Sequence, residues 1–170
     1  MTDCGAHAFD ELSYPGDSIK QEYKEDILVG YRWHDTKKIP ALFPFGHGLS
    51  YTTFTYGKPV ASAKTMAADG TLTVTVAVKN TGSIAGKEIV QLYVGDDKCS
   101  VLRPVKELKH FAKVALAPGE EKSVTFTLTP DDLKFYDEAS AAWKYEPGKF
   151  KAYVCASSAD VRGIVSFEMQ

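Results

Sequence analysis

The sequence contains little cysteine. Cys4, Cys99 and Cys155 are the only three among 170 residues, and no two of them form a CxxC pair. So odd and sparse a set indicates neither a disulfide framework nor a zinc site. A single bridge is left open, but the simpler expectation is unpaired thiols, with Cys155 buried in a strand.

Long apolar runs and an excess of basic residues are also missing. No segment approaches the roughly 20 apolar residues that cross a bilayer, and residues 1–17 lack the basic region and apolar stretch of a signal peptide. Lys and Arg number 20 against 22 acidic residues, giving a net charge of -2. No basic stripe is present to attract nucleic acid. We therefore expect neither a membrane nor a nucleic acid as partner.

The familiar catalytic and ligand-binding motifs are absent as well. There is no GxSxG around Ser50, and the glycines of "GHG" (46–48) lack the lysine and helix of a phosphate loop. The four histidines show no HxH or HxxxH spacing, and His47, between two glycines, is better explained by packing than by ligation. We predict no metal and no cofactor.

Acidic residues occur in adjacent pairs, whereas a glycosidase needs two carboxyl groups facing each other at about 5 Å or about 6.5–9.5 Å. Neighbouring residues on a strand point to opposite faces, and those in turns point to water. We therefore assign no catalytic residue. Glu25/Asp26 is the least ordinary pair, because Tyr31 and Trp33 follow it closely. The other pairs are Asp96/Asp97, Glu120/Glu121 and Asp131/Asp132.

Period-two alternation dominates residues 51–170. "TLTVTVAV" (71–78) places Leu and Val against Thr and Ala, which is typical of a strand with one buried face. Similar stretches, with turn signals every 8 to 12 residues, run to the end of the chain. We predict an all-β fold: an immunoglobulin-like, fibronectin type III-like antiparallel β-sandwich. The stretches are 87–96, 107–120 (which ends in a turn at 118–120), 121–130, 148–158 and 161–170, with weaker ones near 54–66 and 135–145.

Residues 1–50 do not share this pattern. "SIKQEYKEDILVGYRWHDTKKIP" (18–40) shows no helix or strand long enough to stand alone, and a segment of this size buries too little surface to order itself. We interpret residues 1–50 as an irregular N-terminal arm, either the end of another domain or a segment laid across the sandwich.

An aromatic cluster lies in "DDLKFYDEASAAWKYEPGKF" (131–150). One interpretation is a platform for sugar rings formed by Tyr136, Trp143 and Tyr145. The other is core packing, which we favour because the space between two sheets needs large side chains.

Several motifs together resemble the C-terminal end of family 3 glycoside hydrolases, the β-glucosidases and β-xylosidases. They are "GYRWHD" (30–35), "FPFGHGLSYT" (43–52), "RPVKELKHF" (103–111) and "PGE" (118–120), in the family's order and spacing. The resemblance implies a barrel with the catalytic aspartate, an α/β domain with the acid/base glutamate, and a fibronectin type III-like domain. Only the end of the second and all of the third correspond to this chain, so no catalytic residue is carried over.

The resemblance also suggests interface residues. Residues 1–50 would hold the end of the α/β domain and a linker, and "FPFGHGLSYTTF" would be the hinge into the sandwich, bent at Pro44, Gly46 and Gly48. Phe43, Phe45, Leu49, Tyr51 and Phe54 would bury against the neighbouring domain. The candidate interface or hinge residues are Tyr31, Arg32, Trp33, Phe43, Pro44, Phe45, Gly46, His47, Gly48 and Tyr51.

The expected function is that of a non-catalytic C-terminal module that braces the catalytic domains of a β-glucosidase-like hydrolase. One alternative is a module that binds β-linked oligo- or polysaccharide, and a weaker one is a complete small glycosidase using Glu25 or Asp26. The chain shows no signal peptide, and the resemblance is compatible with an exported parent enzyme, periplasmic or secreted.

Overall fold

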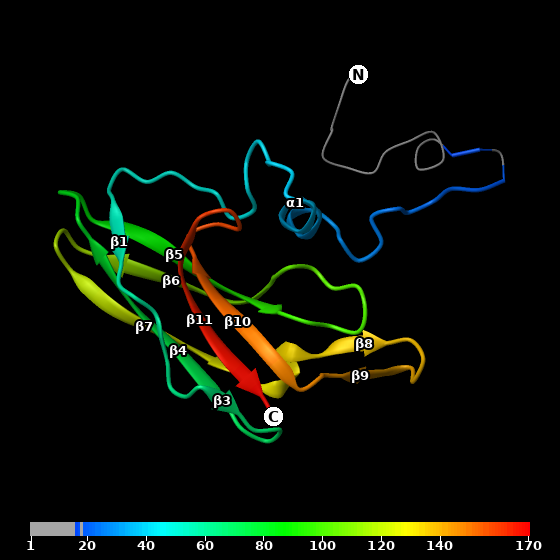
Figure 1. The fold of residues 1–170 in the computed structure, drawn as a ribbon. Coiled ribbons are helices and arrows are strands. Elements are labelled where there is room, and N and C mark those ends of the chain that lie inside the picture. Colours follow the sequence, from blue (N-terminus) through cyan, green and yellow to red (C-terminus); the bar gives the residue numbers. More distant parts are fainter. Residues whose placement is uncertain (1–15, 18) are drawn as a thin grey trace.

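The computed structural model describes residues 16–17 and 19–170. Two β-sheets pack face to face, and a short helix lies on one of them (Figure 1). The predicted β-sandwich is confirmed. Its strands are β1 (Phe54–Tyr56), β2 (Val60–Ala61), β3 (Thr65–Met66), β4 (Leu72–Asn80), β5 (Gly86–Asp96), β6 (Glu107–Leu116), β7 (Glu121–Leu128), β10 (Gly148–Cys155) and β11 (Val161–Met169).

The sheets differ in how they are built. In the first, β4 pairs with β1, β2 and β7. In the second, the order is β3, β11, β10, β5, β6. The predicted antiparallel pairing holds except between β3 and β11, which run parallel over two residue pairs. A hairpin of β8 (Phe135–Asp137) and β9 (Ala142–Lys144), preceded by a 3-10 helix (Pro130–Leu133), extends from one end of the sandwich (Figure 1).

Alternation explains the core between the sheets. On β4, Leu72, Val74, Val76 and Val78 are at most 1% exposed, and the Thr residues between them face outward. From the second sheet, the rings of Phe150 and Phe167 stack at 5.7 Å in the same core. The inward faces of both sheets thus form one hydrophobic core.

Strand β5 departs from alternation because both of its faces are covered. Val90, Leu92 and Val94 belong to the core between the sheets, while Gln91 and Tyr93 between them are also buried. Helix α1 (Tyr31–Lys37) and the turn after it lie over the outer face of this sheet (Figure 1). The arm therefore forms a partial third layer.

Helix α1 is only seven residues long and contains no fully buried residue. Isolated helices this short are unstable in water, so its conformation depends on contacts with the sandwich. The sequence had left open whether the arm ends another domain or lies across the sandwich. Across the residues that the structure describes, no helix combines the length and apolar character needed to cross a bilayer.

Candidate functional site

Polar contacts attach α1 to the segment that leads into β6. Lys106 Nζ lies 2.6 Å from Asp35 Oδ2, and both side chains are close to nine-tenths buried. The Val105 amide donates to Thr36 Oγ1 at 3.0 Å, and Arg32 forms an ion pair with Glu107 at 3.2 Å. Because a charge pair this well buried is costly to separate, the helix is fixed on the sandwich.

Tyr31 adds an aromatic anchor at the start of the same helix. Its hydroxyl accepts a hydrogen bond from the Leu108 amide at 2.9 Å. Its ring stacks on Phe45 at 5.1 Å and meets the edge of Tyr93 at 5.6 Å. Tyr31 thus joins the helix, the following turn and the outer face of β5.

The thiol of Cys155 is free and fully buried in β10, as predicted. Burial raises its pKa to about 12, with Lys106 opposing that effect. A thiol with so high a pKa is unreactive at neutral pH. Cys99 is free and partly exposed, and Cys4 lies outside the described residues.

The turn at Pro44–His47 is closed by a hydrogen bond from the His47 amide to the Pro44 carbonyl at 2.9 Å. Gly46 has a φ of 76°, which favours glycine, and a Cβ there would collide with the buried amide of Gln91. The Ser158 amide donates to the Phe45 carbonyl at 2.8 Å. The predicted bend at Gly46 is present, but Gly48 has open space around it and no positive φ.

The outer side of this region carries large exposed apolar side chains. We call residues 42–51 the aromatic turn segment. Leu42 is 88% exposed, Phe43 74%, Leu49 94% and Tyr51 97%. Phe54, which was expected at the same surface, instead packs against the chain's own core. The backbone of the segment is therefore bonded to the sandwich, while its large apolar side chains are exposed to solvent.

A cavity of about 490 Å³ opens between α1 and the aromatic turn segment. Tyr31, Phe43 and Phe45 supply its aromatic lining, and His34, Asp35 and Ser158 supply polar groups. Asp35 is already paired with Lys106, so the cavity is a mixed surface hollow without a free acidic pair.

A second cavity, of about 480 Å³, lies beneath the other end of the segment. Glu88 and Asp160 both line it, which sequence spacing did not indicate because they lie 72 positions apart. Tyr56 Oη donates to Glu88 Oε1 at 2.6 Å, and Arg162 lies 2.7 Å from Asp160. Burial raises the pKa of Glu88, opposed by the Tyr56 hydrogen bond. Each carboxylate thus has a neighbour within this chain.

The pair that the sequence singled out does not reach either cavity. Glu25 and Asp26 lie in a turn whose Asp26 amide donates to the Tyr23 carbonyl at 3.1 Å, and Asp26 is exposed. Neither lines the two cavities. Neither of these two cavities therefore places a sugar between the Glu25 and Asp26 carboxyl groups.

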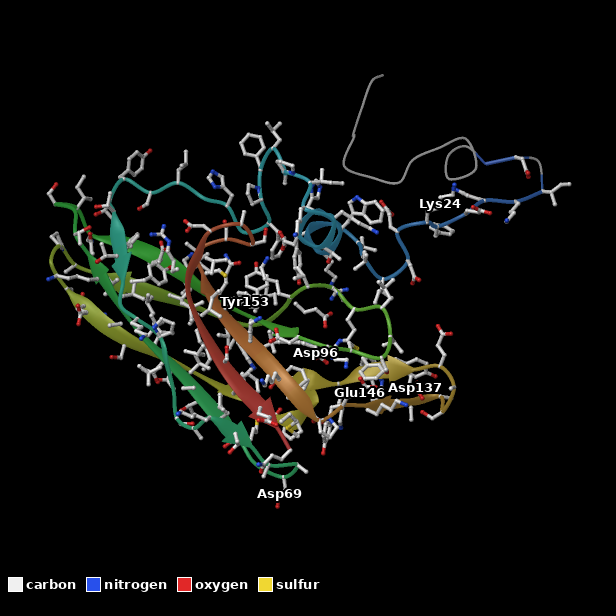
Figure 2. All side chains as sticks on the ribbon, in the orientation of Figure 1. Lys24, Asp69, Asp96, Asp137, Glu146 and Tyr153 are labelled. Atoms are coloured by element: carbon white, nitrogen blue, oxygen red, sulfur yellow. The ribbon has the colours of Figure 1, made fainter. Side chains whose placement is uncertain are left out.

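Another cluster that the sequence did not indicate joins Asp96, Cys99 and Glu146. One ligand atom from each lies within 4.8 Å of the others, and Figure 2 shows Asp96 and Glu146 near the hairpin that carries Asp137. Asp96 lies 3.6 Å from Arg103, and Glu146 accepts hydrogen bonds from the amide and hydroxyl of Ser100. These contacts fix the loop between β5 and β6.

The aromatic residues of the β8–β9 hairpin divide between inside and outside. Tyr136 is 50% exposed and Trp143 66% exposed, so the core-packing prediction was wrong for both. Phe135 is buried, and Tyr145 packs against the core. The reason is that the hairpin extends beyond the sheets, and Tyr145 follows the last residue of β9.

Comparisons with known proteins agree with this architecture. Residues 88–158 match the fibronectin type III-like domain. Over 168 residues the chain is 67% identical to the β-glucosidase BoGH3A of Bacteroides ovatus, covering 99% of this chain and 22% of that protein. Thermostable β-glucosidase B of Acetivibrio thermocellus is 51% identical over 150 residues, or 88% of this chain and 20% of that protein.

Among solved structures, DesR, a β-glucosidase from Streptomyces venezuelae in complex with D-glucose, superposes with a TM-score of 0.87 at 42% identity. The match covers 97% of this chain and 21% of DesR. The fold and the matches define a fibronectin type III-like domain with an N-terminal arm. The chain matches a C-terminal part of family 3 β-glucosidases, and it spans about a fifth of the length of these relatives.

Proposed function

We propose that this chain braces the catalytic domains of a β-glucosidase-like hydrolase through the aromatic turn segment. The observation that carries the proposal is the exposure of Leu42, Phe43, Leu49 and Tyr51, at 74–97%, on a segment fixed from behind. Apolar side chains gathered in this way mark interaction surfaces. Since this chain covers only 20–22% of its relatives, which are therefore about five times as long, the remainder of such an enzyme is the partner that fits.

The proposed interface is rigid before its partner arrives. The Asp35–Lys106 ion pair fixes the helix that precedes the segment, and the hydrogen bond from the Ser158 amide to the Phe45 carbonyl fixes the turn in its middle. A preordered surface loses less conformational entropy on docking than a loose linker. An interface of ordinary size, roughly 800 Å² on each partner, needs more area than the four apolar side chains offer, so α1 would contribute through Arg32 and Trp33.

We propose no catalytic role for the chain itself. The two carboxylates that share a cavity, Glu88 and Asp160, are held by Tyr56 and Arg162. A glycosidase of either type needs one carboxyl free to give a proton and another free to attack or to activate water. The arrangement is better explained as support beneath the aromatic turn segment.

A chimeric enzyme tests the bracing role. In it, the matching C-terminal part of BoGH3A is replaced by this chain, which is 67% identical to it. We expect an active enzyme whose melting temperature falls by several degrees when Leu49 and Tyr51 are changed to Ser. The matched control is Phe111→Ser, because Phe111 is 69% exposed on β6.

The same variants in the 170-residue chain alone should unfold at the parent's denaturant concentration, because the changed side chains contact solvent there. Equal melting temperatures for the Leu49/Tyr51 variant and the unmodified chimera would contradict bracing through this segment.

A further inference from the structure

The β8–β9 hairpin presents a second aromatic surface, separate from the aromatic turn segment. Tyr136 and Trp143 are paired across the two strands. Their ring centroids are 5.7 Å apart and their planes are inclined by 72°. Because side chains alternate along a strand, both rings lie on one face of the hairpin and form an open corner, with half of Tyr136 and two thirds of Trp143 exposed.

The opposite face of the hairpin is anchored. Phe135 is buried there, with the Arg103 guanidinium 5.5 Å from its ring centre. Asp137 forms an ion pair with Lys144 at 2.8 Å and accepts a hydrogen bond from the Ser140 amide at 3.0 Å. The loop between β5 and β6 therefore packs on the Phe135 face, and the aromatic corner is held in place with its own face free.

The corner is too small for a protein partner. Fully exposed aromatic side chains present roughly 150–250 Å² each, so the exposed parts of Tyr136 and Trp143 together offer about 250 Å². On the hairpin itself no other large apolar side chain is exposed, and the exposed Val101, Leu102 and Val105 belong to the loop that packs on its opposite, Phe135 face. A stable protein interface needs roughly 800 Å² on each side. The area instead suits one or two pyranose rings.

The polar surroundings also suit a ligand rich in hydroxyl groups. Among the described residues, neither the Tyr136 hydroxyl nor the Trp143 indole N–H has a hydrogen-bond partner. Lys134 and the exposed Glu138 directly flank strand β8, which carries Tyr136. Lys134 pairs with Asp131, which is 80% exposed. Donors and acceptors thus surround the apolar corner.

We propose that Tyr136 and Trp143 form a carbohydrate-contact site that takes the pyranose rings of a β-linked gluco-oligosaccharide. The apolar face of one ring stacks on Trp143, while the edge of Tyr136 closes the corner and its hydroxyl meets the sugar hydroxyls. Tyr145, the third candidate from the sequence, packs against the core and takes no part. The choice of β-linked glucose as ligand rests on the proposed function. The assignment of a sugar site to the corner rests on its geometry alone.

The test is a titration of the full 170-residue chain, carrying Trp33→Phe so that Trp143 is its one tryptophan. Cellohexaose, laminarihexaose and mannohexaose are added separately, and tryptophan fluorescence and amide NMR shifts are recorded. We expect weak saturable binding of at least one glucan with shifts around Tyr136 and Trp143. Trp143→Ala, which has no tryptophan left and is followed by amide shifts, should weaken binding about 5- to 30-fold, the factor that one to two kcal/mol represents. Tyr136→Phe keeps the ring and tests the hydroxyl alone.

Phe111→Ala is the control, since it removes an exposed ring elsewhere and should leave binding unchanged. No saturable change with any oligosaccharide overturns the site, as do shifts confined to the aromatic turn segment. Binding of mannohexaose alone keeps a sugar site but overturns the assignment of glucose, and with it the support drawn from the proposed function. Failure of the chimera with intact glucan binding would overturn bracing alone.

Discussion

The arm region and the β8–β9 hairpin are both short additions to the sandwich, yet they are attached differently. Helix α1 and the turn after it cover the outer face of β5, with Tyr31 touching Phe45 and Tyr93. The hairpin is anchored on one face and leaves Tyr136 and Trp143 free on the other. Exposed aromatic residues in the two regions therefore lead to different proposals. In the arm region they belong to a broad surface suited to another domain, and in the hairpin they form a small corner suited to a sugar.

The largest expected difference between the two regions comes from breaking their ion pairs. Lys106→Met leaves the Asp35 carboxylate, 13% exposed, without its partner, and should lower the free energy of unfolding by about 3 kcal/mol. Lys144→Met in the hairpin removes a pair whose lysine is 46% exposed and should cost less than about 1 kcal/mol. Urea denaturation of both variants measures this. Equal losses would mean that α1 is no more firmly attached than the hairpin.

Two glycines sharpen the description of the turn. Gly46→Ala places a Cβ against the buried Gln91 amide at a φ of 76° and should cost about 2 kcal/mol. Gly48→Ala enters open space and should be neutral or slightly stabilising. Thermal unfolding of the pair distinguishes them. If Gly46→Ala had the same melting temperature as the unmodified chain, the turn would be flexible, like a free hinge.

The smallest expected effect concerns Glu88, beneath the aromatic turn segment. Because burial raises its pKa, the folded chain holds the proton more tightly than the unfolded chain does. Its contribution to stability is therefore full below the unfolded pKa and is lost as pH rises through the folded pKa. Glu88→Gln should raise the free energy of unfolding at pH 7, by under about 1 kcal/mol, and flatten its dependence on acidic pH.

The control for this pH series is Glu121→Gln, which removes a carboxylate from an exposed position on β7. A Glu88→Gln profile parallel to that of the parent between pH 4 and pH 8 would show that Glu88 is not responsible for it.

Sequence reasoning reached the sandwich because alternation is local. Leu72 to Val78 on β4 show the inward face directly. It left open whether the arm lies on the sandwich. The apolar run from Ile89 to Val94, interrupted only by Gln91, was a usable signal for such a layer, since a strand without alternation is covered on both faces. The prediction that Tyr136 and Trp143 pack in the core was wrong. Alternation indicates which residues share a face of a strand, but it does not indicate whether a second sheet covers that face. Interface roles for Arg32 and Trp33, and the domain boundary between residues 50 and 51, stay predictions.

The Asp35–Lys106 ion pair also determines where a force on the preceding chain first reaches the sandwich. A pull on the chain ahead of Leu28, which is 2% exposed, meets the buried ion pair and the Tyr31 contacts before it reaches β1 at Phe54. In an enzyme of the proposed kind, the flexible stretch between the catalytic domains and the sandwich would thereby be shorter by more than twenty residues. Joined in this way, two domains would move as one stiff body where a free linker would let them swing.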